Sequence, residues 1–162
     1  MSQIESLIPK EYGSSASETP GARRLLQSLS DAGAPWALVT SCTRALLQAW
    51  LERMALPAPP VAVAAEDVSA GKPHPACYKL GRQRVGVGEQ ARVLVVEDSP
   101  SGVAAGKAAG CVVLGLATTH RVEQLRIAGA DCIVKDLNSV QLVDRKQGEY
   151  TICLGNKWVE DH

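Results

Sequence analysis

The chain has 162 residues, 46% of them hydrophobic and 21% charged, which is typical of a single globular domain with a buried core. Lysine plus arginine and aspartate plus glutamate each number 17, so the formal net charge is zero. This balance argues against nucleic-acid or anionic-membrane partners, and no apolar run approaches the roughly 20 residues that span a bilayer.

Two features of the sequence bear on where the protein works. The N-terminal residues lack the basic start and apolar centre of a signal peptide. The five cysteines are an odd number without a C-x-x-C pair, and most lie in or beside apolar stretches. We therefore expect a reducing compartment and a cytoplasmic protein.

Strands and helices alternate along most of the chain. Residues 1–19 are polar and rich in serine, and no structure is predicted there. Continuous Val/Leu/Ile runs predict strands, and apolar residues at helical spacing predict helices. In chain order we expect helix 20–33, strand 36–40, helix 43–54, strand 60–65, a helix of about a dozen residues after a loop at 72–75, strand 92–97, helix 100–109, strand 111–116, helix 122–128 and strand 131–135. After Leu142 the pattern loosens, and residues 150–154 are interpreted as an edge strand.

This alternation indicates an α/β fold, a Rossmann-like parallel sheet with helices on both faces, in three layers. In such sheets ligands bind outside the carboxyl ends of the strands. The residues at those ends are Ser41, the pair Glu97 and Asp98, and the run Thr118, Thr119, His120. Lys72 lies in a loop that could reach the same edge.

Each of these residues also has an ordinary structural interpretation. Asp98 and Ser99 before Pro100 form a good helix start, and the Ser41-Cys42-Thr43 stretch could cap the next helix. His120 alone suggests a surface side chain. The combination is more informative, because a hydroxyl, a lysine and two adjacent acids suit a phosphoryl group with Mg²⁺.

The order of these residues resembles the haloacid dehalogenase superfamily. LVTSCT is similar to its second motif, GKPHPACY to its third and VVEDSPSGVAAGKAAG to its fourth. The stretch GLATTHRVEQLRIAGADCIVKDL resembles the branch of glycerol-3-phosphate phosphatases, 2-deoxyglucose-6-phosphate phosphatases and β-phosphoglucomutase. The resemblance covers about residues 18–142.

The resemblance implies a role for each candidate residue. Ser41 and Cys42 would bind the phosphoryl oxygens, and Lys72 would neutralise the phosphate, so that Ser41 and Lys72 take part in catalysis. Glu97 and Asp98 would hold Mg²⁺ directly or through water. Thr118, Thr119 and His120 would shape the rim of the site. The implied substrate is a small polyol- or sugar-phosphate monoester.

One departure from the family pattern is large. Family members begin with a strand ending in D-x-D-G-[TS], whose first Asp is the nucleophile, and no D-x-D occurs in this sequence. The resemblance implies that residues 1–19 are the remnant of a cap helix and its linker, that 20–142 are the core, and that 143–162 are a C-terminal extension. The first strand and the cap domain would be missing. That strand would lie between the strands at 36–40 and 92–97, so its loss should leave unpaired backbone groups on both neighbours.

Three explanations for this departure stay open. The sequence could come from an incomplete gene model of a phosphatase, or from a genuine short form that binds phosphate, Mg²⁺ or a protein partner without catalysis. In the third explanation, another element takes the place of the missing central strand. This element is the 150–154 strand, a second copy of the chain through self-association, or a partner chain. We expect no efficient turnover by this chain alone. A signalling receiver domain is disfavoured, because receivers place the acid pair at the first strand and the lysine last.

Overall fold

The computed structural model describes residues 8–146 and 149–155. None of its described helices is both long enough and apolar enough to cross a membrane. The α-helices are α2 (Ile8–Tyr12), α3 (Ala22–Asp31), α4 (Arg44–Met54), α5 (Ala76–Arg84), α6 (Pro100–Ala108) and α7 (Val122–Ile127), with short 3₁₀ helices η1 (Ala65–Asp67) and η2 (Leu137–Ser139).

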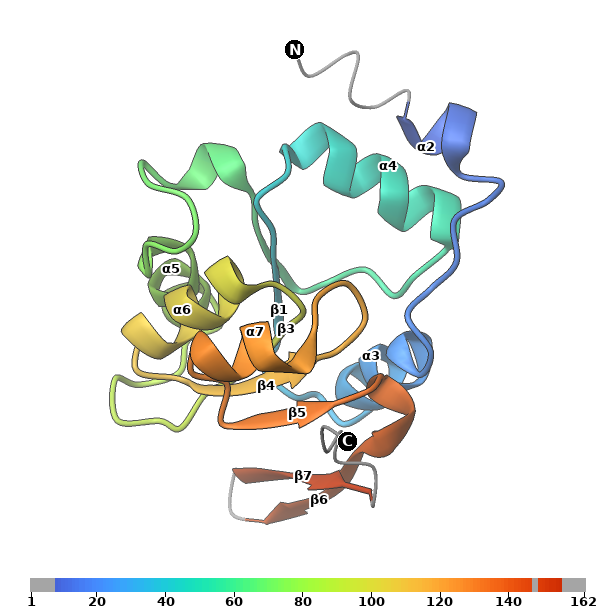
Figure 1. The fold of residues 1–162 in the computed structure, drawn as a ribbon. Helices are drawn as coiled ribbons and strands as arrows, with labels where there is room; N and C mark the ends of the chain where they lie inside the picture. Colours follow the sequence, from blue (N-terminus) through green and yellow to red (C-terminus); the bar gives the residue numbers. More distant parts are fainter. Residues whose placement is uncertain (1–7, 147–148, 156–162) are drawn as a thin grey trace.

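The parallel strands form two separate sheets (Figure 1). In the first, β1 (Ala37–Val39) pairs with β2 (Val61–Val63), in register from Ala37 opposite Val61. The second has the order β3 (Leu94–Glu97), β4 (Val112–Leu116), β5 (Cys132–Val134). The predicted α/β class, the helices of the core and all five core strands are confirmed, with ends that differ by a few residues.

The break between the sheets lies between β1 and β3. Within the described residues, β1 pairs only with β2 and β3 only with β4, so each has one edge without a strand partner. This confirms the expectation that the strands at 36–40 and 92–97 carry unpaired backbone groups. Parallel sheets are usually continuous and covered on both faces, which makes the break a notable feature of the fold.

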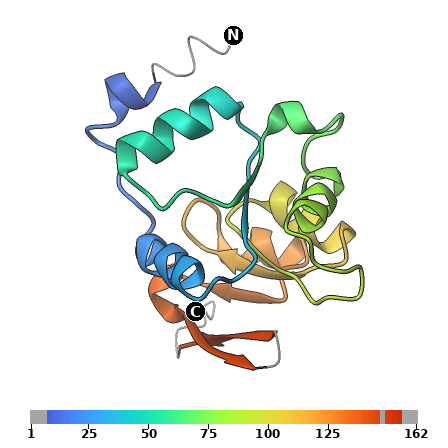
Figure 2. The ribbon, with the colours of Figure 1, turned by 180° about the vertical axis from the view of Figure 1, so that it is seen from behind.

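Two apolar clusters hold the layers together. One lies between α5, α6 and α7 and the sheets, and it includes Val63 of β2 and Val95 of β3, so it joins both sheets. The other lies on the opposite face of β4 and β5, where Leu25 of α3 packs near Leu114 and Leu116 (Figure 2). Strands β4 and β5 are therefore covered on both faces, as alternating side-chain directions along a strand require.

The C-terminal residues fold differently from the prediction. Strand β6 (Val140–Lys146) pairs antiparallel with β7 (Glu149–Leu154), and neither joins a parallel sheet. A strand at 150–154 is present, but it forms a hairpin with a strand that we did not predict. The idea that residues 150–154 fill the gap between β1 and β3 is therefore wrong. The alternating burial of β7 explains the placement, because such a strand has only one apolar face to cover.

The N-terminal segment was also predicted incompletely. Residues 8–12 form the short helix α2, which contacts α4. The residue pattern predicted no structure there, whereas the family resemblance implied a cap helix and its linker. The earlier residues of the predicted cap remnant lie outside the described residues. The wider division into segments 1–19, 20–142 and 143–162 stays a prediction.

Candidate active site

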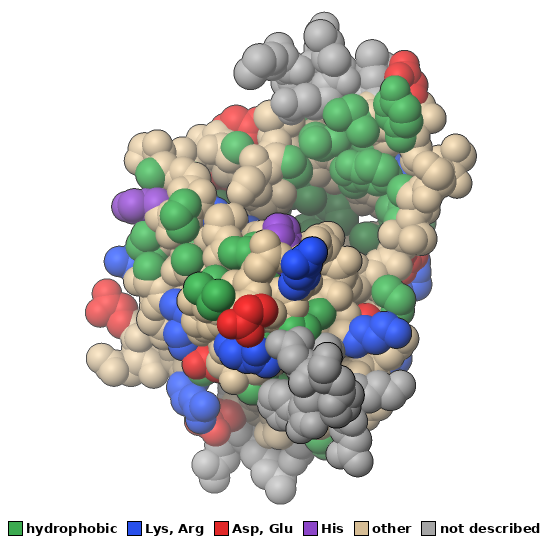
Figure 3. All heavy atoms as spheres, viewed as in Figure 1, with side chains coloured by type: hydrophobic (Ala, Val, Ile, Leu, Met, Phe, Trp, Pro, Cys, Tyr) green, Lys and Arg blue, Asp and Glu red, His purple; other side chains and the backbone are tan. Residues whose placement is uncertain are grey.

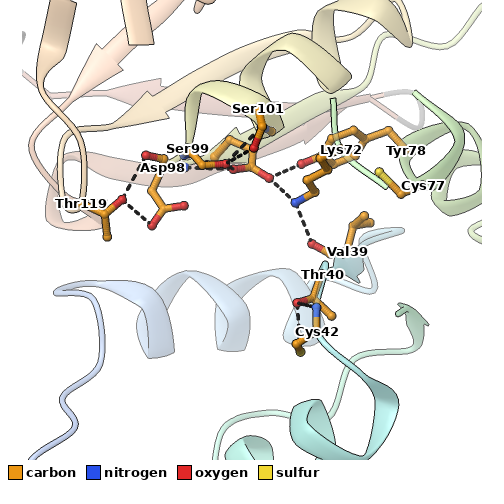
Figure 4. A network of polar contacts seen from close by, with 12 residues as sticks. Val39, Thr40, Cys42, Lys72, Cys77, Tyr78, Asp98, Ser99, Ser101 and Thr119 are labelled. Carbon is orange, nitrogen blue, oxygen red and sulfur yellow. Dashed lines mark hydrogen bonds and ion pairs between the residues drawn. The ribbon is translucent and has the colours of Figure 1, made fainter. Parts of the chain in front are cut away.

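Glu97, the last residue of β3, is the centre of a polar network (Figure 4). Its side chain is 7% exposed. One oxygen, Oε1, accepts hydrogen bonds from Lys72 Nζ and from the Tyr78 hydroxyl. The other, Oε2, accepts from the backbone N–H of Asp98 (3.2 Å) and Ser99 (3.3 Å) and from Ser99 Oγ (3.1 Å). Five protein donors therefore hold this carboxylate.

The local sequence explains why Glu97 can lie so close to the next helix. Ser99 is the N-cap of α6 and accepts a hydrogen bond from Gly102 N at 3.1 Å, and Pro100 occupies the first helical turn. An alanine Cβ at Gly102 would overlap the Glu97 carboxylate. Glycine at this position therefore allows the first turn of α6 to pack directly on the acid.

Lys72 connects the two sheets. Its Nζ pairs with Glu97 at the end of β3 and lies 3.4 Å from the backbone oxygen of Val39 at the end of β1. The same nitrogen lies 5.2 Å from the centre of the Tyr78 ring, within the range of a cation–π contact. The prediction that the 72–75 loop brings Lys72 to the carboxyl ends of the strands is confirmed by this geometry.

Burial and hydrogen bonding shift the pKa of Glu97 in opposite directions. Burial alone would raise the pKa of Glu97, but hydrogen bonds from Lys72 and Tyr78 hold that pKa below its usual range. Burial, together with the adjacent Glu97 charge, raises the pKa of Tyr78. At neutral pH the network therefore contains the Glu97 carboxylate and a neutral Tyr78 phenol.

Asp98 points away from Glu97, because neighbouring side chains at the end of a strand face opposite sides. Its Oδ2 accepts a hydrogen bond from Thr119 Oγ1 at 2.9 Å, and its backbone oxygen lies 3.0 Å from His120 Nδ1. Thr119 also donates to the backbone oxygen of Asp98 at 3.1 Å. The structure thus places two of the three predicted rim residues against Asp98, while Thr118 is exposed.

The loop after β1 is arranged by its own hydroxyls. Thr40 Oγ1 accepts from Cys42 N and lies 3.1 Å from Cys42 Sγ, and Thr43 caps α4 by accepting from Leu46 N. Ser41 lies between them with an exposed side chain. The capping interpretation of this stretch is therefore right for Thr43. Thr40, for which no role was predicted, organises the turn that presents Ser41 and Cys42.

Tyr78, Ser99 and Gly102 belong to the site as neighbours of Glu97 and were not predicted. Tyr78 stands in the quoted GKPHPACY stretch, six residues after Lys72, and that position was the available signal. Ser99 was noted only as a helix cap. Gly102 gave no signal, since its importance comes from a contact made across the fold.

The described residues contain no group of three or more His, Cys, Asp or Glu side chains arranged to hold a metal ion. Both Glu97 oxygens are already hydrogen-bonded, whereas Asp98 Oδ1 has no hydrogen-bond partner among the described residues. Mg²⁺ in phosphoryl-transfer sites commonly uses one or two carboxylates, with water and substrate phosphate completing the shell. Asp98 fits that pattern in this structure, and Glu97 fits it only by exchanging a protein donor for the ion.

A cavity of about 820 Å³ lies away from this network, between the start of α3 and the segment after α4. Two arginines line it, and both are hydrogen-bonded: Arg23 to the backbone oxygens of Met54 and Ala55, and Arg24 to those of Leu137, Asn138 and Val140. The residues that line the cavity include neither a lysine nor two adjacent acids, and Arg23 is already paired with Glu18, so the candidate site stays at the strand ends.

The fold is α/β with parallel strands, and a lysine and two acids lie at the carboxyl ends of those strands, a combination that suits a phosphoryl group. Comparison with known proteins specifies the family. The model of the haloacid dehalogenase-like hydrolases matches residues 10–110. The chain belongs to this family.

Known relatives agree with this assignment. Glycerol-1-phosphate phosphohydrolase 2 of Saccharomyces cerevisiae is 40% identical over 149 residues, which cover 88% of this chain and 60% of that protein. Hexitol phosphatase A of Escherichia coli is 41% identical over 133 residues, covering 82% of this chain and 60% of that protein. The chain thus spans about three fifths of the length of these curated relatives.

Solved structures show the same fold. CbbY from Rhodobacter sphaeroides in complex with phosphate superposes with a TM-score of 0.69 at 25% identity, covering 84% of this chain and 60% of that one. The expected family and fold class are therefore confirmed.

Proposed function

We propose that this chain forms the core of a phosphatase that acts, with Mg²⁺, on small polyol- or sugar-phosphate monoesters. The observation that carries the proposal is the position of Lys72, whose Nζ joins the carboxyl ends of β1 and β3 by contacting Val39 O and Glu97. The matched relatives named as phosphatases of glycerol phosphate and hexitol phosphate support the substrate class.

Charge balance supports a divalent cation. Lys72 contributes one positive charge, and Glu97 and Asp98 contribute two negative charges, so these three residues sum to −1. A phosphate monoester brings up to two further negative charges, and close like charges repel strongly when partly buried. Mg²⁺ would neutralise the phosphoryl oxygens and polarise them as a Lewis acid. Asp98 would hold it, and Glu97 would hold Lys72 in position.

The remaining residues have supporting roles in this proposal. Ser41 and Cys42, presented by the turn that Thr40 organises, would donate hydrogen bonds to the phosphoryl oxygens. Thr119 would fix the direction of the Asp98 carboxylate, and His120 would hold the Asp98 backbone through its carbonyl oxygen. Thr118 would lie at the rim. We place this chemistry in the cytoplasm, because the five cysteines form no disulfide and suit a reducing compartment.

A second function concerns the 162 residues by themselves. Because they contain no D-x-D sequence to supply an attacking Asp, we propose that they bind phosphate and Mg²⁺ without efficient turnover. By themselves, these residues would then bind a small phosphorylated metabolite.

Binding and turnover can be measured on the same preparation. Titration calorimetry with inorganic phosphate, with and without Mg²⁺, should show at least tenfold tighter phosphate binding when the cation is present. Asp98→Asn should remove that difference, and Glu89→Gln, an exposed acid remote from the site, should keep it. Phosphate release from glycerol 3-phosphate and p-nitrophenyl phosphate should be absent. Mg²⁺-independent binding would overturn the proposed cation site, and Mg²⁺-dependent release that Asp98→Ala abolishes would overturn the binding-only form.

A further inference from the structure

Protein donors occupy both oxygens of the Glu97 carboxylate. Oε1 accepts from Lys72 Nζ and the Tyr78 hydroxyl, and Oε2 accepts from two backbone N–H groups and from Ser99 Oγ. A carboxylate offers about four lone-pair sites, and this one receives five donors. Glu97 therefore has no free position for a cation, whereas Asp98 Oδ1 has no hydrogen-bond partner among the described residues.

Four of these five donors are also fixed by other features of the structure. The two backbone N–H groups belong to the residues that directly follow Glu97 in the chain. Ser99 Oγ also caps α6, and Lys72 Nζ also contacts Val39 O. The Tyr78 hydroxyl, in contrast, has no partner other than Glu97 in the described part of the chain. The polar contribution of Tyr78 to the site is therefore its hydrogen bond to Oε1.

Helix α5 holds Tyr78 in a fixed position. The residue lies on the buried face of α5 and is 8% exposed. A Cβ at Gly81, on the same face, would lie 3.2 Å from Val39 Cγ2, so α5 packs directly on β1. From the side of α6, the first helical turn at Gly102 leaves the Glu97 carboxylate no room to move. The acid is therefore held between α5 and α6.

We propose that the Tyr78 hydroxyl is a positioning group that completes the donor set of Glu97 and so leaves Asp98 as the acid that binds the cation. This inference rests on the proposed function, because it concerns the Mg²⁺ of the same site. Groups behind a metal ligand commonly orient the oxygens that face the ion. Without the hydroxyl, one lone pair of Oε1 becomes free and Glu97 becomes a second oxygen ligand beside Asp98. Tyr78→Phe should therefore bind the cation more tightly, although it loses a hydrogen bond of the fold.

The test measures cation binding by the 162-residue chain and needs no turnover. The probe is Mn²⁺, which prefers the same oxygen ligands as Mg²⁺; electron paramagnetic resonance measures its free concentration, and Mg²⁺ is added in competition. Background binding should be weak, because the described residues hold no group of three metal-binding side chains, and the acids on the face in Figure 3 are scattered among basic residues. We expect Tyr78→Phe to bind Mn²⁺ at least fivefold more tightly than wild type. Tyr12→Phe removes the same hydroxyl from a 65% exposed tyrosine and should stay within twofold.

A double-mutant cycle then tests whether the gain comes through Glu97. In the Glu97→Gln background no carboxylate is available at this position, so Tyr78→Phe should change the Mn²⁺ affinity by less than twofold. A merely structural role of Tyr78 would instead lower affinity and stability together. Urea unfolding verifies that each variant is folded. Tyr78→Met, which also lacks the hydroxyl, is the second variant if Tyr78→Phe does not fold.

Two results would overturn the role of Tyr78. One is an affinity of Tyr78→Phe equal to or below that of wild type, and the other is a gain that persists in the Glu97→Gln background. Failure of the proposed function gives a different result, a wild-type chain that binds no Mn²⁺ that Mg²⁺ can displace. The role of Tyr78 is decided in that case as well, because a gain in Tyr78→Phe that depends on Glu97 supports it and the absence of that gain overturns it.

Discussion

Glu97 shows how much one residue depends on its neighbours in this fold. The acid is buried at the end of β3, and Lys72, Tyr78, Ser99 and the first turn of α6 surround it. A buried carboxylate is stable only when opposite charge and hydrogen bonds replace its water. This requirement predicts that changes at Gly102 and at Lys72 destabilise the protein.

The first prediction concerns the close contact of Gly102 with Glu97. Gly102→Ala should lower the free energy of unfolding by about 1–3 kcal/mol, because the new methyl group displaces the carboxylate from its donors. This loss should exceed the gain of about 1 kcal/mol that alanine normally brings to a helix. Urea unfolding measures the change. Gly88→Ala, whose Cβ meets no atom within 4 Å, should stay within about 0.5 kcal/mol of wild type. A Gly102→Ala variant as stable as wild type would contradict the packing described here.

The second prediction concerns the ion pair of Lys72 with Glu97. Lys72→Met should destabilise the chain by about 3 kcal/mol, because the acid keeps its burial and loses its cation. Adding Glu97→Gln should recover part of this loss, so that the double-mutant cycle gives a coupling energy of about 1–3 kcal/mol. The exposed pair of Arg126 with Glu123 is the comparison, and Glu123→Gln should change stability by less than about 0.5 kcal/mol. Additive effects in the buried pair would argue against direct contact.

At the scale of elements, η1 joins the helices around the first sheet. The Asp67 carboxylate pairs with Arg44 at the start of α4 and, at 3.0 Å, with Arg84 at the end of α5. It also accepts from Ala64 N at 2.8 Å. One short acidic segment thus fixes the ends of two helices against β2.

The pH dependence of stability should reveal this junction. The hydrogen bond from Arg84, followed by that from Ala64 N, holds the pKa of Asp67 well below its usual range. An acid whose pKa is lowered by folding stabilises the protein above its ordinary pKa of about 4 and loses that effect as the pH falls toward the folded-state pKa. Asp67→Asn should therefore lower the urea midpoint at pH 7, and the difference from wild type should shrink below pH 4. Glu89→Gln, an exposed acid without a partner among the described residues, should show no such trend. A difference that is constant with pH would exclude an ionic role for Asp67.

For the whole molecule, one apolar cluster spans both parallel sheets. Val63 of β2, Val95 of β3 and Leu125 of α7 belong to the same cluster, although no hydrogen-bonded ladder in the described part of the chain joins β1 to β3. Side-chain packing through α5 and α6 thus holds the two sheets together in place of hydrogen bonds between strands.

We therefore predict one cooperative unfolding transition. Tryptophan fluorescence, to which the buried Trp36 beside β1 contributes, and circular dichroism should give the same urea midpoint. Leu125→Ala should shift both signals equally, by about 2–4 kcal/mol, since Leu125 is fully buried. Ile127→Ala on the exposed side of the same helix should shift neither by more than about 0.5 kcal/mol. Two separate transitions would show that the two sheets unfold independently.

The sequence alone determined most elements of the core and its class. Helix periodicity, caps such as Ser99 before Pro100, and short apolar runs are local patterns, and local patterns record secondary structure directly. The positions of Ser41, Glu97 and Asp98 after predicted strands also followed from the sequence, because parallel strands bring their carboxyl ends to one edge.

Tertiary structure alone decided which of these residues meet. Lys72 and Tyr78 reach Glu97 across 25 and 19 residues of chain, and Asp98 turns away toward Thr119. The β6–β7 hairpin and the Gly102 contact were likewise absent from the sequence pattern. Periodicity gives the direction of a side chain relative to its own helix or strand, whereas these contacts depend on how loops and crossovers place distant elements together, and that placement is settled by packing in the folded chain.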